Sequence, residues 1–212
     1  MLKNGSKMEA RTAIEIRRLR HSEASSPLMD QIVALHHATF PTGVLARLGN
    51  SFMRDYYTAI VCAPEGHLWI AVREAQVLGF LACTTDRSRF ETEHRAGAAR
   101  RALLIRLLTF RMPPRVILRA LRKQRLARGL PQSAELLAIA VSPECRREGI
   151  GRRLLQEWHT LLRSPGVSEY LVFTDNEEGY RFYSKSGGQR LFEFRLGGHT
   201  SAAFLMKVEP ES

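Results

Sequence analysis

The chain has 212 residues and a formal net charge of +11; 44% of the residues are hydrophobic and 25% are charged. This composition is ordinary for a globular protein with a substantial core, and it excludes wholesale disorder. No apolar run approaches the ~20 residues that cross a bilayer, and the N-terminus lacks the apolar stretch of a secretory signal. We therefore expect a loose tail over residues 1–12 and one domain over residues 13–209. Cys62, Cys83 and Cys145 lack metal-like spacing, and we expect buried, inert thiols in a reducing cytoplasm.

In the first half of the chain, the apolar pattern predicts a strand, two helices and a hairpin. Residues 14–19 begin with alternating apolar and charged residues, which is typical of a strand. A helix begins near Ser25-Ser26-Pro27 and is broken at Phe40-Pro41-Thr42-Gly43. The other elements expected in this half are a helix over 51–61 and two strands, 68–73 and 77–82, joined by a short turn. We expect His36, His37, Trp69 and, later in the chain, Trp158 to be structural.

The positive charge is concentrated in one segment. Residues 95–128 contain ten arginines and Lys123 but no acidic residue, so the other 32 − 11 = 21 basic residues balance the 21 acidic ones. Leucine-rich stripes on either side of Pro113-Pro114 predict two amphipathic helices in a basic insertion over residues 95–130.

Three interpretations of this insertion stay open. It can be a solvated helical pair that packs on the domain or on a second subunit of a homodimer. It can be a cover that attracts an anionic acceptor. It can also contact a membrane surface or nucleic acid, although sparse aromatic residues argue against sequence-specific recognition of nucleic acid.

The second half predicts alternating strands and helices and a final hairpin. The expected elements are a strand over 135–141, a helix over 149–163, a strand over 170–173, a helix over 176–185 and a hairpin of 190–196 with 201–208. The order of elements predicts a mixed α/β sheet with helices on both faces.

Residues 142–151 link a strand to a helix and have the features of a phosphate-binding turn. Gly149 and Gly151 stand where the helix begins, and unpaired N–H groups with a positive dipole end favour anions there. Arginines at 146, 147, 152 and 153 add full charges. A P-loop is excluded because its Gly-Lys-Ser/Thr run is missing. A dinucleotide-dependent oxidoreductase is disfavoured because Leu154 occupies the position of the third glycine.

These motifs resemble the GNAT acetyltransferase superfamily. Residues 146–151, Arg-Arg-Glu-Gly-Ile-Gly, match its Arg/Gln-x-x-Gly-x-Gly/Ala signature, and the preceding strand looks like its fourth strand. Residues 176–183 match Asn-x-x-Ala-x-x-x-Tyr, with Gly179 for the small residue, whereas Ser186-Gly187-Gly188 lacks the phenylalanine of the usual Leu-Gly-Phe. The resemblance covers residues 135–188. It implies a mixed, mostly antiparallel central sheet with flanking helices and with the basic insertion between the third and fourth strands.

The resemblance also implies an activity: transfer of an acetyl group from acetyl-CoA to a primary amine, by direct attack in a ternary complex and without a metal. An amino sugar is the favoured kind of acceptor. The implied cofactor-binding residues are Arg146, Arg147, Glu148, Gly149, Ile150, Gly151 and Arg152 for the pyrophosphate, Ile139, Ala140 and Val141 beside the pantetheine, and Asn176 and Tyr180 along the channel.

The implied catalytic residues are Tyr183, as the acid that protonates the thiolate, and Glu135, as the general base. Three of the implied roles have an alternative. Tyr183 can be a core aromatic, and Asn176 can be only a helix cap. Glu135 can be a solvated carboxylate, with a water relay in place of the general base. The alternative function is a lipid- or nucleic-acid-tethered binding module with a vestigial CoA site.

Overall fold

The computed structural model describes residues 13–95, 114–127, 129–130, 134–196 and 198–209. Its strands form one seven-stranded sheet in the order β1-β2-β3-β4-β5-β7-β6. The strands are β1 (Glu15–Arg18), β2 (Gly66–Arg73), β3 (Gln76–Thr84), β4 (Glu135–Val141), β5 (Glu169–Thr174), β6 (Gln189–Leu196) and β7 (His199–Lys207). Every neighbouring pair is antiparallel except β4 and β5, which confirms the expected mixed, mostly antiparallel sheet.

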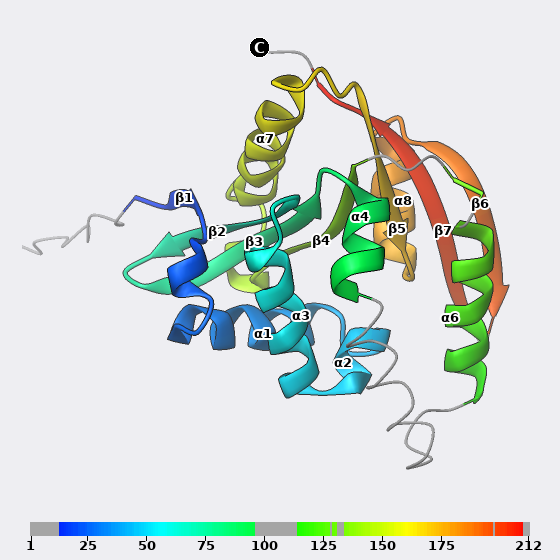
Figure 1. Ribbon diagram of the computed structural model, residues 1–212, viewed down its shortest axis with the longest axis horizontal. Helices are drawn as coiled ribbons and strands as arrows, with labels where there is room; N and C mark the ends of the chain where they lie inside the picture. The colour runs from blue at the N-terminus through cyan, green and yellow to red at the C-terminus, as the bar shows by residue number, and fades with distance from the viewer. Residues whose placement is uncertain (1–12, 96–113, 128, 131–133, 197, 210–212) are drawn as a thin grey trace, which may run out of the picture.

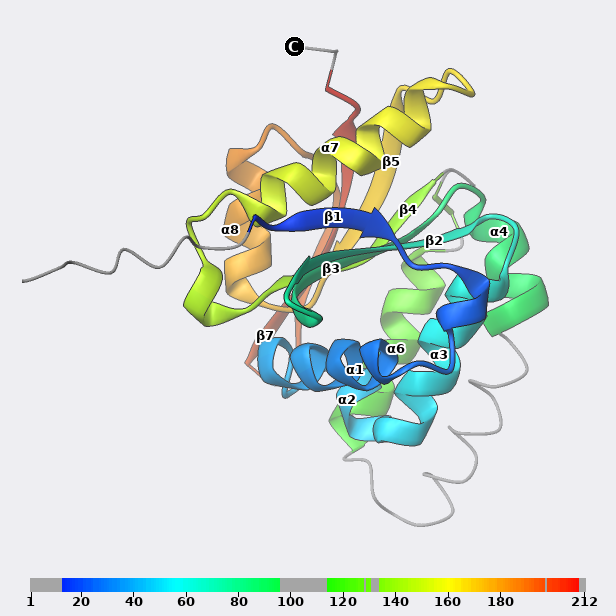
Figure 2. The ribbon, with the colours of Figure 1, turned by 90° about the vertical axis from the view of Figure 1, so that its left-hand side faces the viewer.

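Helices cover both faces of this sheet. The α-helices are α1 (Pro27–Thr39), α2 (Val44–Leu48), α3 (Asn50–Cys62), α4 (Arg87–Phe90), α6 (Pro114–Ala127), α7 (Ile150–Arg163) and α8 (Glu177–Lys185). Short helical turns occupy η1 (His21–Glu23), η2 (Glu91–Arg95) and η3 (Pro143–Cys145). Figure 2 shows α7 and α8 on one side of the sheet and α1, α3 and α6 on the other.

Each face of the sheet has its own apolar core. On one side, Met29, Tyr57 and Phe80 are fully buried between α1, α3 and the β2–β3 hairpin. On the other side, Leu154 and Trp158 of α7 pack against residues from β3, β5 and β7. Trp69 and Trp158 are therefore core residues, as expected. The expectation of three buried thiols is wrong at one position: Cys83 and Cys145 are buried, but Cys62, the last residue of α3, is exposed.

The order of the predicted elements is confirmed, with two additions. The sequence did not indicate α2, or the short helical stretch formed by α4 and η2 after β3. Of the predicted basic insertion, the second helix is present as α6 and begins at Pro114. The first basic helix, expected near residues 103–108, and the expected tail over residues 1–12 lie outside the described residues.

The junction between β4 and β5 is the feature of the fold that positions the site. Within the described chain, these parallel strands pair only at Glu135–Leu171 and Leu136–Val172. They diverge towards their carboxyl ends, as Figure 1 shows. The edge of β4 over residues 137–141 that faces β5 is consequently left without a neighbouring strand, and we call it the open edge of β4. Buried backbone groups normally have a partner, so this edge is suited to receive an extended ligand.

Candidate functional site

The turn after β4 has the backbone geometry of an anion site. Gly149 caps α7 with φ +77°, and Arg147 also has a positive φ of 72°. A Cβ at Gly149 would meet nothing within 4 Å, so the dihedral angle, and not crowding, is what favours glycine. No side chain caps α7. The first N–H groups of this fourteen-residue helix therefore remain available at its positive dipole end.

The charges around this turn are mostly unneutralised. Arg146, Arg147 and Arg152 are exposed. Glu148 points away to Arg73 of β2, with 3.0 Å between Arg73 Nη2 and Glu148 Oε2, and Arg146 has a weak exposed contact of 3.8 Å with Glu178 of α8. The local charge is therefore positive and favours phosphate.

The start of α7 packs closely on the sheet. Ile150 is buried, and a Cβ at Gly151 would lie 3.7 Å from Val141 Cγ2. Ile139 and Val141 are partly buried against the α7 cluster, whereas Ala140 is buried on the opposite face. The open edge of β4 thus leads directly, through residues 142–148, to the free N-terminus of α7.

Asn176 is a helix cap, one of the alternatives expected for it. Its Oδ1 accepts a 2.6 Å hydrogen bond from the Gly179 amide. Gly179 itself is tightly confined, because a Cβ there would lie 2.3 Å from Thr174 Oγ1. Gly188 stands where the family pattern has phenylalanine, and a Cβ there would lie 2.8 Å from the Tyr183 carbonyl oxygen. The chain therefore passes too close to the backbone of α8 for a side chain at this position.

The two tyrosines of α8 have different surroundings. Tyr183 is 8% exposed and belongs to the cluster that also contains Tyr170 and Phe204 and touches the β4 side chains. Burial raises the pKa of Tyr183 well above its usual value, so its hydroxyl keeps its proton. The Tyr180 hydroxyl instead accepts a 2.7 Å hydrogen bond from Arg190 and lies 3.0 Å from a Glu193 oxygen, which ties α8 to β6.

Glu135 is buried in an ion pair, so the alternative to its catalytic role, a solvated strand-end carboxylate, is wrong. Its Oε2 lies 3.1 Å from Arg87 Nε, and the two side chains are 6% and 4% exposed. Arg87 also donates to the Ala127 carbonyl at 3.3 Å and lies over the Phe173 ring at 5.3 Å. The sequence did not single out Arg87. The only local signal is Asp86 before it, whose Oδ1 caps α4.

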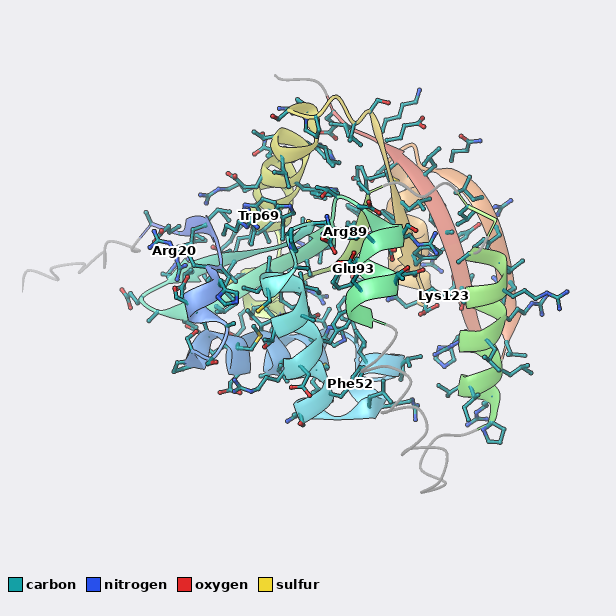
Figure 3. All side chains as sticks on the ribbon, in the orientation of Figure 1. Arg20, Phe52, Trp69, Arg89, Glu93 and Lys123 are labelled. Atoms are coloured by element: carbon teal, nitrogen blue, oxygen red, sulfur yellow. The ribbon has the colours of Figure 1, made fainter. Side chains whose placement is uncertain are left out.

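On the sheet face opposite α8, α6 packs against β6 and lies over Phe173 of β5 (Figure 2). Lys123 reaches the carboxyl end of β5, where its Nζ lies 3.2 Å from Asp175 Oδ2 (Figure 3). Burial works to raise the pKa of Asp175, but Lys123 beside it holds that pKa below its usual range. Lys123 also lies over the Phe173 ring at 5.1 Å, and Arg122 lies over Phe194 at 5.0 Å.

The histidine pair on α1 is structural, as expected. His36 is buried, and its Nδ1 lies 2.6 Å from the Tyr57 hydroxyl, while His37 contacts Asn50 at 2.7 Å. The described part of the chain has no cluster of three or more potential metal ligands. It also has no helix of the length and apolar character needed to span a bilayer.

Comparison with known proteins assigns this arrangement to a family. A family model described as the Acetyltransferase (GNAT) family matches residues 29–188. No curated protein sequence matches the chain.

Solved structures share the fold over nearly the whole chain. A Drosophila melanogaster polyamine N-acetyltransferase has a TM-score of 0.62 at 16% identity and covers 92% of this chain and 100% of its own. An aminoglycoside 6'-N-acetyltransferase complexed with coenzyme A has a TM-score of 0.58 at 16% identity, covering 93% and 99%. The paiA N-acetyltransferase from Thermoplasma acidophilum, in complex with coenzyme A, has a TM-score of 0.55 at 16% identity, covering 92% and 99%. At these identities the likeness is one of fold.

Proposed function

Because this chain belongs to the GNAT acetyltransferase family, we propose that it transfers the acetyl group of acetyl-CoA to a primary amine. The observation that carries the proposal is the continuity of two features: the open edge of β4 and the glycine-capped, arginine-flanked N-terminus of α7. One binds an extended amide-bearing arm, the other binds phosphate, and acetyl-CoA contains both groups in sequence.

The proposed position of the cofactor follows from these two features. The pyrophosphate accepts hydrogen bonds from the first N–H groups of α7, and the exposed arginines at 146, 147 and 152 surround it. The pantetheine lies beside residues 139–141 and pairs with backbone groups that have no strand partner. The Oδ1 of Asn176 is engaged by the Gly179 amide, so Asn176 contacts the pantetheine with its remaining polar groups. Tyr180 lines the channel with its ring, because its hydroxyl is bound to Glu193 of β6.

In the proposed reaction, a neutral amine attacks the thioester carbonyl carbon. The C–N bond forms, the C–S bond breaks, and the amine loses a proton as the thiolate gains one. A backbone N–H of β4 stabilises the developing oxyanion. Tyr183 donates the proton, or a hydrogen bond, to the departing thiolate, because burial keeps its hydroxyl protonated.

Glu135 stays the proposed general base, with a definite condition attached. Its carboxylate is engaged by Arg87, so it must exchange that contact for the amine or for a bridging water before it accepts a proton. A lysine-like amine, with a pKa of about 10.4, is mostly protonated at neutral pH and needs such assistance. A water relay therefore remains the alternative to direct abstraction by Glu135.

Ligand-induced stabilisation tests the cofactor assignment. Acetyl-CoA or CoA should raise the melting temperature. At a ligand concentration of one hundred times Kd, the free energy of unfolding should increase by about 2.7 kcal/mol. Gly149→Ala and Arg152→Gln should reduce that gain. If millimolar CoA produces no shift, the proposal fails. Free CoA thiol is then measured against amine panels that include polyamines and aminoglycosides, the classes named for two structural neighbours.

The exposed side of α6 favours a second function, attachment to an anionic membrane surface. Leu118 and Leu121 are 55% and 53% exposed, and Arg115, Arg122 and Arg125 are exposed on the same helix. Basic amphipathic helices bind anionic lipid in this way. Co-sedimentation with phosphatidylserine vesicles, lost in Leu118→Ser/Leu121→Ser or at high salt, would support it. Equal recovery with neutral vesicles would count against it.

A further inference from the structure

A hollow of about 120 Å³ lies between α2, the first turns of α6 and the tip of the β6–β7 hairpin. Three arginines, Arg47, Arg115 and Arg119, line it together with Thr42 and His199. We infer that this hollow is a subsite for an anionic group on the amine acceptor, a phosphate in the first instance. This inference rests on the proposed acetyltransferase activity and specifies the class of acceptor.

The strongest observation is the state of Arg119. Its residue is only 4% exposed, and its guanidinium has no hydrogen bond or ion pair to any other described residue. The nearby carboxylate, Asp175, attracts Arg119 through its charge, but its contact, at 3.2 Å, is with Lys123. A bound anion would give this buried cation a contacting counter-charge, which favours anion binding at Arg119.

The lining is one-sided in charge. None of the residues that line the hollow is acidic. Arg47 is held at the rim, because its Nε donates to the Thr42 carbonyl at 3.3 Å. Guanidinium groups present planar, paired donors that match both carboxylate and phosphate oxygens. Three of them around one small hollow favour a phosphate through its greater negative charge.

The size of the hollow indicates a group and not a whole molecule. Pockets for drug-sized ligands enclose about 300–1,000 Å³, compared with about 120 Å³ here. The rest of the acceptor must extend outside it. Arg115, Arg119 and Lys123 follow one another at four-residue spacing along one face of α6, which spans about 12 Å. At the far end of this row, Lys123 contacts Asp175, next to the end of β5 that diverges from β4. The row of cations along α6 therefore points from the hollow towards the proposed thioester, the direction in which the inferred acceptor would extend.

The same geometry argues against a polycationic acceptor. Polyamines and aminoglycosides, which two structural neighbours are named for, would place positive charge beside this row of cations. Like charges at such distances are repelled, and this repulsion contributes to specificity.

Anion binding is tested with the CoA-saturated protein, so that the turn at 146–151 is already occupied. Inorganic pyrophosphate, titrated by calorimetry, should bind the wild type and should bind Arg119→Gln at least tenfold more weakly. Arg122→Gln, on the same helix but outside the lining, is the matched control and should bind like the wild type. If Arg119→Gln does not fold, Arg47→Gln at the exposed rim gives the same comparison. Absence of binding by the wild type, or equal loss in Arg122→Gln, overturns the inference.

Kinetics identify what carries the anion. Glucosamine 6-phosphate is compared with glucosamine, and glycine with ethanolamine, to separate a phosphate from a carboxylate. The expected result is a KM at least tenfold lower for the phosphorylated sugar than for glucosamine. Arg119→Gln should raise the KM for the phosphorylated sugar to that of glucosamine and leave kcat unchanged. Equal KM values for the two sugars overturn the assignment. If CoA stabilises the protein but pyrophosphate does not bind, the subsite alone is wrong; if CoA fails to bind, the proposed function is wrong.

Discussion

Replacing Glu135 by glutamine separates a structural role from a catalytic one. The Arg87 and Glu135 side chains are 4% and 6% exposed, and removing one partner of such a buried pair typically costs about 3–5 kcal/mol. Arg87 keeps the Ala127 carbonyl at 3.3 Å and Glu91 at 3.5 Å, so we expect the lower end of that range. For a chain of this length, about 3 kcal/mol lowers the melting temperature by roughly 6–12 °C.

The double variant Arg87→Met/Glu135→Leu, measured beside Arg87→Met and Glu135→Leu alone, gives the decisive comparison. It leaves neither charge of the buried pair behind, and Glu91, which loses its contact with Arg87, is solvent-accessible. The stability of the double variant should therefore lie above that of Glu135→Gln, with a coupling of at least about 2 kcal/mol. Urea denaturation followed by fluorescence of the buried Trp69 and Trp158 measures both. Additive losses, or a loss below about 1 kcal/mol in Glu135→Gln, would refute the reasoning.

Activity of the same variants decides the second role. If Glu135 is only a partner of Arg87, the stabilised double variant should recover acetyl transfer. If Glu135 is the general base, the double variant should fold and bind acetyl-CoA, yet stay slow and lose the acidic limb of its pH–rate profile.

Three further predictions concern single positions. Tyr183→Phe should lower kcat about 10²–10⁴-fold with acetyl-CoA binding retained; since burial raises the pKa of Tyr183, the wild type should show no alkaline limb from this group below its usual pKa of about 10. Gly179→Ala should destabilise by about 1–3 kcal/mol, because its Cβ would lie 2.3 Å from Thr174 Oγ1, and Thr174→Ala should rescue it; a gain in stability in the single variant would show that the site is not crowded. Burial lowers the pKa of His36 from 6.5 to about 4, so its contribution to stability is complete above pH 6.5 and is lost as the pH falls towards 4. Urea titrations should therefore show a lower free energy of unfolding at pH 5 than at pH 7, and this difference should be smaller in His36→Phe.

The parts of the site that the sequence predicts are those built from neighbouring residues. The turn at 146–151 and the cap of α8 depend on short-range backbone geometry, and Gly149 and Asn176 adopt the expected conformations. The roles of these residues towards acetyl-CoA stay predictions.

The parts that the sequence does not predict depend on contacts between distant segments. Arg87 is one arginine among many until the fold brings it against Glu135. The Tyr180 hydroxyl is drawn to β6 by Arg190 and Glu193, which no local pattern indicates. Charge arithmetic located the basic segment, but only the packing of α6 distinguishes buried Arg119 from its exposed neighbours.

The two-residue junction of β4 with β5 has a mechanical consequence. It divides the sheet into a half of four strands and a half of three, which are held together by α7 and its apolar cluster on one face and by Arg87, between Glu135 and Phe173, at the junction. A cofactor that lies along the open edge of β4 would contact both halves of the sheet and restrict their relative motion. Amide hydrogen exchange should therefore be fastest, within the sheet, along residues 137–141 of the empty protein and should slow there most when the cofactor binds.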